Sequence, residues 1–139
     1  MFMAEQSDEW VKETLDSAIH EVINTRRFDA PVIRAKPVWH LPGALLLAQF
    51  EVADSAYWLI TGGGGPTDVL SAEVANQPRD AARHFSLKWQ LGAQQLLDGE
   101  AAPPVGMTKR ELKKKTDNLI KCAESLSELV LTEQFWLNH

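Results

Sequence analysis

The sequence is poor in cysteine and lacks the long apolar runs that cross a membrane. Cys122 is the only cysteine among 139 residues, so no disulfide can form within the chain, and we expect it to act as a small buried hydrophobe. No apolar stretch reaches the roughly 18 residues that a transmembrane helix needs. The first residues are acidic and lack the basic start and apolar middle of a signal peptide. We therefore expect a cytoplasmic protein.

Acidic side chains outnumber the cationic ones. Lys and Arg total 14 against 19 Asp and Glu, which gives a net charge of -5. Because nucleic-acid binding usually requires a basic surface, nucleic acid is not an expected partner. Five of the cations cluster near the start of the last predicted helix, where they oppose its dipole and form either a solvated face or a partner's contact: Lys109, Arg110, Lys113, Lys114 and Lys115.

Metal-binding patterns are missing as well, since no group of Cys and His has zinc spacing. We expect no metal and no cofactor. The apolar fraction of 45% and charged fraction of 24% are those of an ordinary globular chain, and the length suits a single domain, residues 1–139. Five tryptophans are spread along it, and we expect core anchors, with pocket lining as the alternative: Trp10, Trp39, Trp58, Trp89 and Trp136.

Three segments have the apolar spacing of helices: residues 7–27, 78–98 and 109–136. Pro78 suits the first turn of the second helix. Thr108, followed three residues later by Glu111, forms a capping box for the third. Residues 99–106, which include Pro103 and Pro104, break the pattern between these two helices.

Between the first two helices the pattern is that of β-strands, at residues 31–39, 44–52 and 56–61. Short connections join them, so we predict a three-stranded antiparallel meander packed against three main helices, an α+β fold. Pro31 and Pro37 place the first strand at an edge. The second strand turns polar on one face, at Gln49 and Glu51, which suggests a sheet covered on one side.

Four consecutive glycines, residues 62–65, follow the third predicted strand. They lack the Lys and Ser/Thr of a phosphate-binding P-loop, and a meander does not supply the βαβ unit of a Rossmann motif. The run is either a tight or mobile connection or the wall of a ligand site. Thr67 and Asp68 are suitable N-caps, so we predict a short helical turn from there to about Glu73.

If a ligand site exists, this junction and the start of the second helix are where we place it. Backbone N–H groups of a glycine loop can hold an anion. Arg79 and Arg83, four residues apart, can clamp a carboxylate or phosphate, and His84 is a candidate general base. The same residues also suit salt bridges and caps. The candidate ligand-binding set is Gly63, Gly64, Thr67, Asp68, Arg79, Arg83 and His84; no catalytic residue is assigned.

A second apolar stripe on the middle helix consists of Leu87 and Leu91, opposite the main stripe. Either the C-terminal helix or another subunit is expected to cover it. A homo-oligomer formed through these two leucines is therefore one expectation, with an unidentified protein or a small anion as other possible partners.

The stretch from Trp39 to Gly99 resembles a family of uncharacterised bacterial proteins, domain of unknown function 4826. The resemblance rests on four segments: Tyr57-Trp58-Leu59-Ile60-Thr61-Gly62, Pro66-Thr67-Asp68, Pro78-Arg79, and Ala82-Arg83-His84-Phe85 through Trp89. The chain departs from the family pattern at the longer glycine run. The resemblance implies a bacterial, cytoplasmic protein and implies no activity.

From the sequence we expect a non-enzymatic binding or accessory protein that self-associates. The alternative is an enzyme or receptor for a small molecule or anion, with its site at Pro66-Thr67-Asp68 and the start of the second helix.

Overall fold

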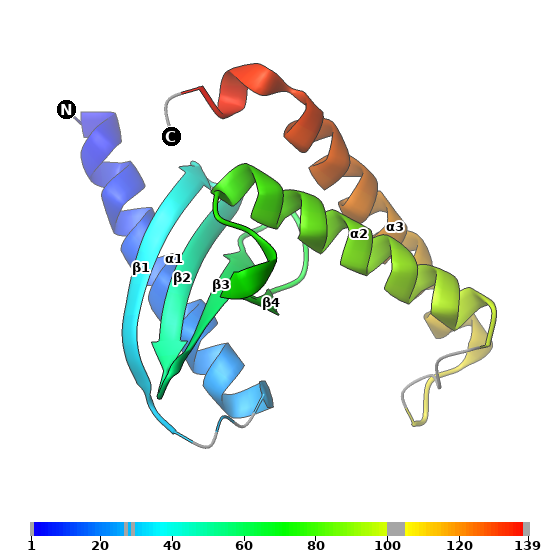
Figure 1. The fold of residues 1–139 in the computed structure, drawn as a ribbon. Coiled ribbons are helices and arrows are strands. Elements are labelled where there is room, and N and C mark those ends of the chain that lie inside the picture. Colours follow the sequence, from blue (N-terminus) through cyan, green and yellow to red (C-terminus); the bar gives the residue numbers. More distant parts are fainter. Residues whose placement is uncertain (1, 27, 29, 100–104, 138–139) are drawn as a thin grey trace.

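The structure is a computed structural model that describes residues 2–26, 28, 30–99 and 105–137. It is an α+β fold in three layers, with one helix on one face of an antiparallel sheet and two on the other (Figure 1). The elements in chain order are α1 (Phe2–Arg26), β1 (Val32–Leu41), β2 (Leu45–Val52), β3 (Ser55–Thr61), β4 (Asp68–Ser71), a 3₁₀ turn (Ala72–Val74), α2 (Pro78–Leu97), α3 (Lys109–Leu131) and a second 3₁₀ turn (Glu133–Phe135). Pro103 and Pro104 lie outside the described residues.

The sheet has four strands in the order β1-β2-β3-β4, so the prediction of three strands was one short. Residues predicted to begin a helical turn at Asp68 instead pair with β3, Leu59 opposite Val69 and Trp58 opposite Leu70. Val69 and Leu70 pack into the apolar clusters on opposite faces, which favours an extended strand over a helical turn. The helical turn begins after β4, with Ser71 as its cap.

Both faces of the sheet are covered, which corrects the expectation of one covered face. Leu46, Ala48 and Phe50 pack under α1, while Leu45 and Leu47 pack under α2 and α3. The two clusters together give the molecule its core. β1 is an edge strand as predicted, and it contains Pro37 and a register shift between Pro37 and Trp39.

α2 matches its predicted position, whereas α1 begins at Phe2, before the predicted residue 7, and α3 ends at Leu131, where a 3₁₀ turn replaces the predicted last helical turn. α2 begins at Pro78, with Gln77 at the N-cap position, and the capping box of Thr108 and Glu111 is present at the start of α3. α2 and α3 form an antiparallel pair, and the hydroxyl of Ser86 donates to the carbonyl of Ala123 across it at 2.8 Å. Four tryptophans are buried: Trp39, Trp58, Trp89 and Trp136.

Candidate functional site

Asp68 is the most constrained polar side chain of the predicted site. It is the first residue of β4 and only 7% exposed. The Lys88 ammonium and the Val69 backbone N–H each donate to its Oδ1 at 2.8 Å, and the Trp89 indole donates to Oδ2 at 3.0 Å. The carboxylate therefore joins the sheet to the middle of α2.

The electrostatics of Asp68 follow from these contacts. Burial alone raises the pKa of the carboxyl group, because it disfavours the charged form. The hydrogen bonds from Lys88 and Val69, the charge of Lys88 and the Trp89 indole outweigh burial, so that the pKa is lowered. Asp68 is thus held as a carboxylate, a state suited to an ion pair and unsuited to a proton donor at neutral pH.

The glycine run is packed against its neighbours. Gly62 has φ +125°, and a Cβ there would lie 2.5 Å from the carbonyl oxygen of Ala44. The Gly64 N–H donates to that same oxygen at 3.0 Å. A Cβ on Gly65 would lie 3.1 Å from the Trp89 ring. The loop therefore needs glycine where its backbone approaches the β1–β2 turn and where it passes Trp89.

Thr61 and Thr67 close the two ends of this loop. Their hydroxyl oxygens are 2.8 Å apart, a hydrogen bond between the last residue of β3 and the residue before β4. Thr67, predicted as a helix cap or a ligand contact, thus contacts the neighbouring strand.

Arg79, Arg83 and His84 lie elsewhere on α2. The Arg79 guanidinium donates from Nε to the carbonyl of Val130 at 2.8 Å, which joins the start of α2 to the end of α3. Arg83 pairs with Asp80 at 3.6 Å, and His84 is exposed. Nine helical positions separate Arg79 from Lys88, roughly 13 Å along the axis.

The structure therefore divides the predicted set into two groups. Gly63, Gly64, Thr67 and Asp68 lie around the loop and the middle of α2, whereas the two arginines and His84 lie toward its start. Lys88 was missed, because it is 20 residues from Asp68 and no local pattern marks it as the partner of that carboxylate. Among the described residues, no group of three or more His, Cys, Asp or Glu is placed to hold a metal ion.

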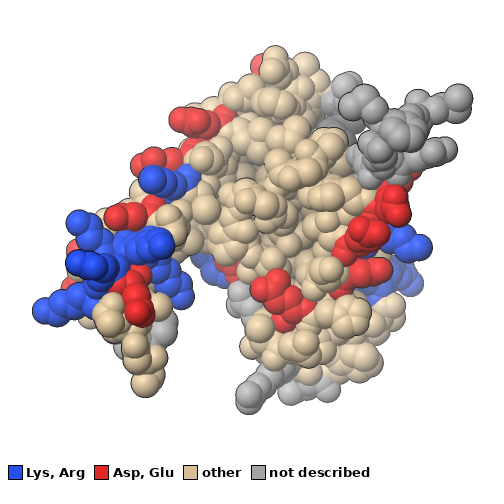
Figure 2. Space-filling view, turned by 180° about the vertical axis from the view of Figure 1, so that it is seen from behind, with Lys and Arg blue, Asp and Glu red and all other residues tan. Residues whose placement is uncertain are grey.

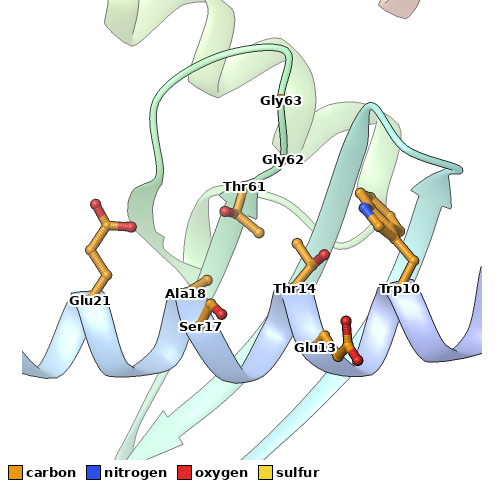
Figure 3. Close-up of a pocket in the computed structure, with 9 residues that line it drawn as sticks. All are labelled: Trp10, Glu13, Thr14, Ser17, Ala18, Glu21, Thr61, Gly62 and Gly63. Carbon is orange, nitrogen blue, oxygen red and sulfur yellow. The ribbon is translucent and has the colours of Figure 1, made fainter.

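Two hollows adjoin the glycine loop. The first, about 400 Å³, lies between α1 and the loop, where Trp10, Thr14 and Glu21 point from α1 toward Thr61 and Gly62 (Figure 3). It is open, and its carboxylates, Glu13 and Glu21, are exposed.

The second hollow, about 230 Å³, lies on the other side of the loop and is apolar. The β1–β2 turn, the loop, α2 and α3 all contribute to it, and its lining residues are Leu41, Ala44, Leu45, Gly64, Trp89, Ser125, Leu126 and Leu129. The indole of Trp89 is fixed in this wall by its bond to Asp68.

Comparison with protein families places the chain. A family model described as a domain of unknown function (DUF4826) matches residues 4–136. The chain belongs to this family. The DUF4826 match covers both helical layers and the sheet, well beyond the stretch on which the sequence resemblance rested.

No curated protein and no solved structure matches the chain. Within the described residues, the helices of this DUF4826 protein include none that is long and apolar enough to cross a membrane.

Proposed function

We propose that this DUF4826 protein is a non-enzymatic binding protein of the bacterial cytoplasm that works as a homodimer, with the outer face of α2 and α3 as its contact. The observation that carries the proposal is the exposure of two apolar side chains one helical turn apart: Leu87 is 54% exposed and Leu91 is 60% exposed. α3 packs against a different side of α2 and leaves both leucines uncovered.

The surroundings of these leucines extend the apolar face. Leu131 of α3, 75% exposed, and Leu87 both line a groove of about 200 Å³. The other residues of its lining are Arg83, Ser86, Gln90, Ser127 and Val130. Adjacent exposed apolar side chains on two neighbouring helices are typical of a protein–protein contact. A face of this kind suits another helical pair.

A second copy of the chain is the occupant that this face fits best. A two-fold axis that passes α2 between Leu87 and Leu91 places Leu87 of one copy opposite Leu91 of the other. The same axis sets the two α3 helices antiparallel. The cationic first half of one α3 then lies beside the second half of the other, which contains Glu124 and Glu128.

The charges of α3 are separated in the way that this arrangement requires. Figure 2 shows Lys and Arg side chains gathered at the end of the molecule where α3 begins. Lys113 and Glu124 both fall on the helix face that contains Ser127. Glu124 is three residues before Ser127, Lys113 is two seven-residue steps before it, and both spacings return to the same side of a helix.

Geometry at the predicted anion site favours this proposal over the alternative. Asp68 is bound by Lys88 and Trp89, and Arg79 is bound to the Val130 carbonyl. These contacts join elements of the fold, which is a structural role, and they occupy groups that a ligand would need.

Sedimentation equilibrium tests the dimer. Leu87→Glu is expected to raise the dissociation constant at least about 30-fold, because the two copies together bury two unpaired carboxylates at a combined cost above about 2 kcal/mol. Ile33→Glu is the matched control: Ile33 is 62% exposed on β1, outside this face, and its replacement is expected to leave the dimer unchanged.

Exchanging the α3 charges tests the arrangement. Lys113→Glu and Glu124→Lys are each expected to weaken the dimer, and the double variant to restore part of the loss. A clean monomer of the unaltered chain at high micromolar concentration would refute the proposal, and equal effects of Leu87→Glu and Ile33→Glu would move the contact elsewhere.

A further inference from the structure

We infer that the apolar hollow beside the glycine loop is a binding site for a small, neutral molecule built on one apolar ring. The inference does not rest on the homodimer. Trp89 lies in the wall of the hollow, whereas Leu87 and Leu91, two residues away on either side, project from the opposite side of α2.

The lining sets the polarity of the ligand. Leu41, Leu45, Leu126 and Leu129 supply branched apolar walls, and none of the described lining residues is charged. A charged ligand entering this hollow would lose hydration without gaining an opposite charge. The ligand is therefore neutral.

Three hydrogen bonds pair polar groups around the hollow within the protein. The Ala44 N–H donates to the Leu41 carbonyl, the Ala44 carbonyl accepts from Gly64, and the Trp89 indole donates to Asp68. Ser125 supplies the remaining side-chain hydroxyl of the lining. The ligand accordingly has at most one hydrogen-bonding group, directed at Ser125.

The size of the ligand follows from the volume. An enclosed, dry apolar cavity of about 150 Å³ takes up benzene. This hollow of about 230 Å³ is partly open to solvent, and its volume accepts one ring with a short substituent. The loop keeps the space open at Gly64, which lines the hollow without a side chain. The Asp68–Trp89 hydrogen bond holds the flat indole in place as one wall before any ligand arrives, which lowers the cost of binding.

Nitrogen–proton correlation NMR on the full chain tests the site with defined probes. Toluene and phenol are expected to bind with a dissociation constant near or below about 1 mM, shifting the resonances of Gly64, Ser125 and the Trp89 indole. Benzoate and benzylammonium have the same ring with a charge, and they are expected to bind at least tenfold more weakly.

Two serines of α3 provide a matched pair of variants. Ser125→Leu fills the hollow and is expected to weaken toluene binding at least tenfold, whereas Ser127→Leu projects into the groove on the other side of α3 and is expected to leave it unchanged. Dispersion of the NMR spectrum verifies that each variant is folded. If Ser125→Leu does not fold, Leu129→Trp replaces it as the filling variant.

Absence of shifts with toluene and phenol at millimolar concentration would overturn the inference. So would equal binding of the neutral and charged rings, or toluene binding that survives a folded filling variant. None of these results bears on the dimer, which is read from sedimentation with Leu87→Glu.

Discussion

Lys88 donates to Asp68 at 2.8 Å, and this ion pair joins helix α2 to the edge strand β4 of the sheet. The two ends differ in environment, because the Asp68 side chain is 10% exposed and that of Lys88 is 40% exposed. The aspartate therefore depends on its partners for charge compensation, whereas the lysine retains water. This asymmetry determines how each substitution acts.

Asp68→Asn is expected to lower the free energy of unfolding by about 2–3 kcal/mol, because a neutral amide oxygen cannot accept from both Lys88 and Trp89 as the carboxylate does. Lys88→Met is expected to cost less, about 1–2 kcal/mol, since Asp68 keeps its bonds from Val69 and Trp89. Urea unfolding of both single variants and the double variant measures the coupling. If the double variant lost the sum of the two single losses in unfolding free energy, the contact between Asp68 and Lys88 would make no contribution to stability.

Acid stability follows from the lowered pKa of Asp68. A carboxyl group with a lower pKa in the folded state stabilises the fold at pH values above its unfolded pKa, about 3.9. That stabilisation is lost as pH falls from there through the folded pKa. Unfolding free energy measured from pH 6 downward is therefore expected to fall more steeply below about pH 4 in the unaltered protein than in Asp68→Asn. Parallel curves would exclude Asp68 as a source of the acid dependence.

Neighbouring glycines of the loop are expected to respond very differently to alanine. Gly62→Ala is expected to cost more than about 2 kcal/mol, because its Cβ meets the Ala44 carbonyl and its φ of +125° disfavours any side chain. At Gly63 the nearest atom to an added Cβ is 3.8 Å away, so Gly63→Ala is expected to be within about 0.5 kcal/mol of neutral. Thermal unfolding of the two variants measures the contrast, and similar midpoints would mean that the loop relaxes freely.

Gly92 offers a stabilising substitution. It lies within α2, and an added Cβ would meet no atom within 4 Å. Gly92→Ala is therefore expected to raise the free energy of unfolding by about 0.5–1 kcal/mol through helix propensity alone. A loss of stability on chemical unfolding would indicate that the space beside Gly92 is occupied, for example by a partner chain.

Local patterns predicted most of this fold. Pro78 and the Thr108–Glu111 box marked the starts of α2 and α3, and alternation marked β2, because capping and pleating depend on nearby residues. β4 was missed since Asp68 resembles a helix cap in isolation. Its extended form depends on pairing with β3, a non-local contact that short-range preferences do not encode.

Only part of the candidate site was predicted, again because its contacts are non-local. The sequence pointed to Asp68 and the glycines, yet the partners Lys88 and Trp89 lie 20 and 21 residues away and meet Asp68 only after α2 crosses the sheet. The apolar hollow has no sequence signature, because four separate segments form it.

Pro37 in β1 affects how copies of this protein meet. A bare strand edge invites another strand, and repeated pairing of that kind produces fibrils. β1 has a proline, which supplies no N–H, and a register irregularity beside it, while the opposite edge is the four-residue β4. Strand-to-strand stacking is thereby disfavoured at both borders of the sheet, and at high concentration the chain is expected to resist amyloid-like growth.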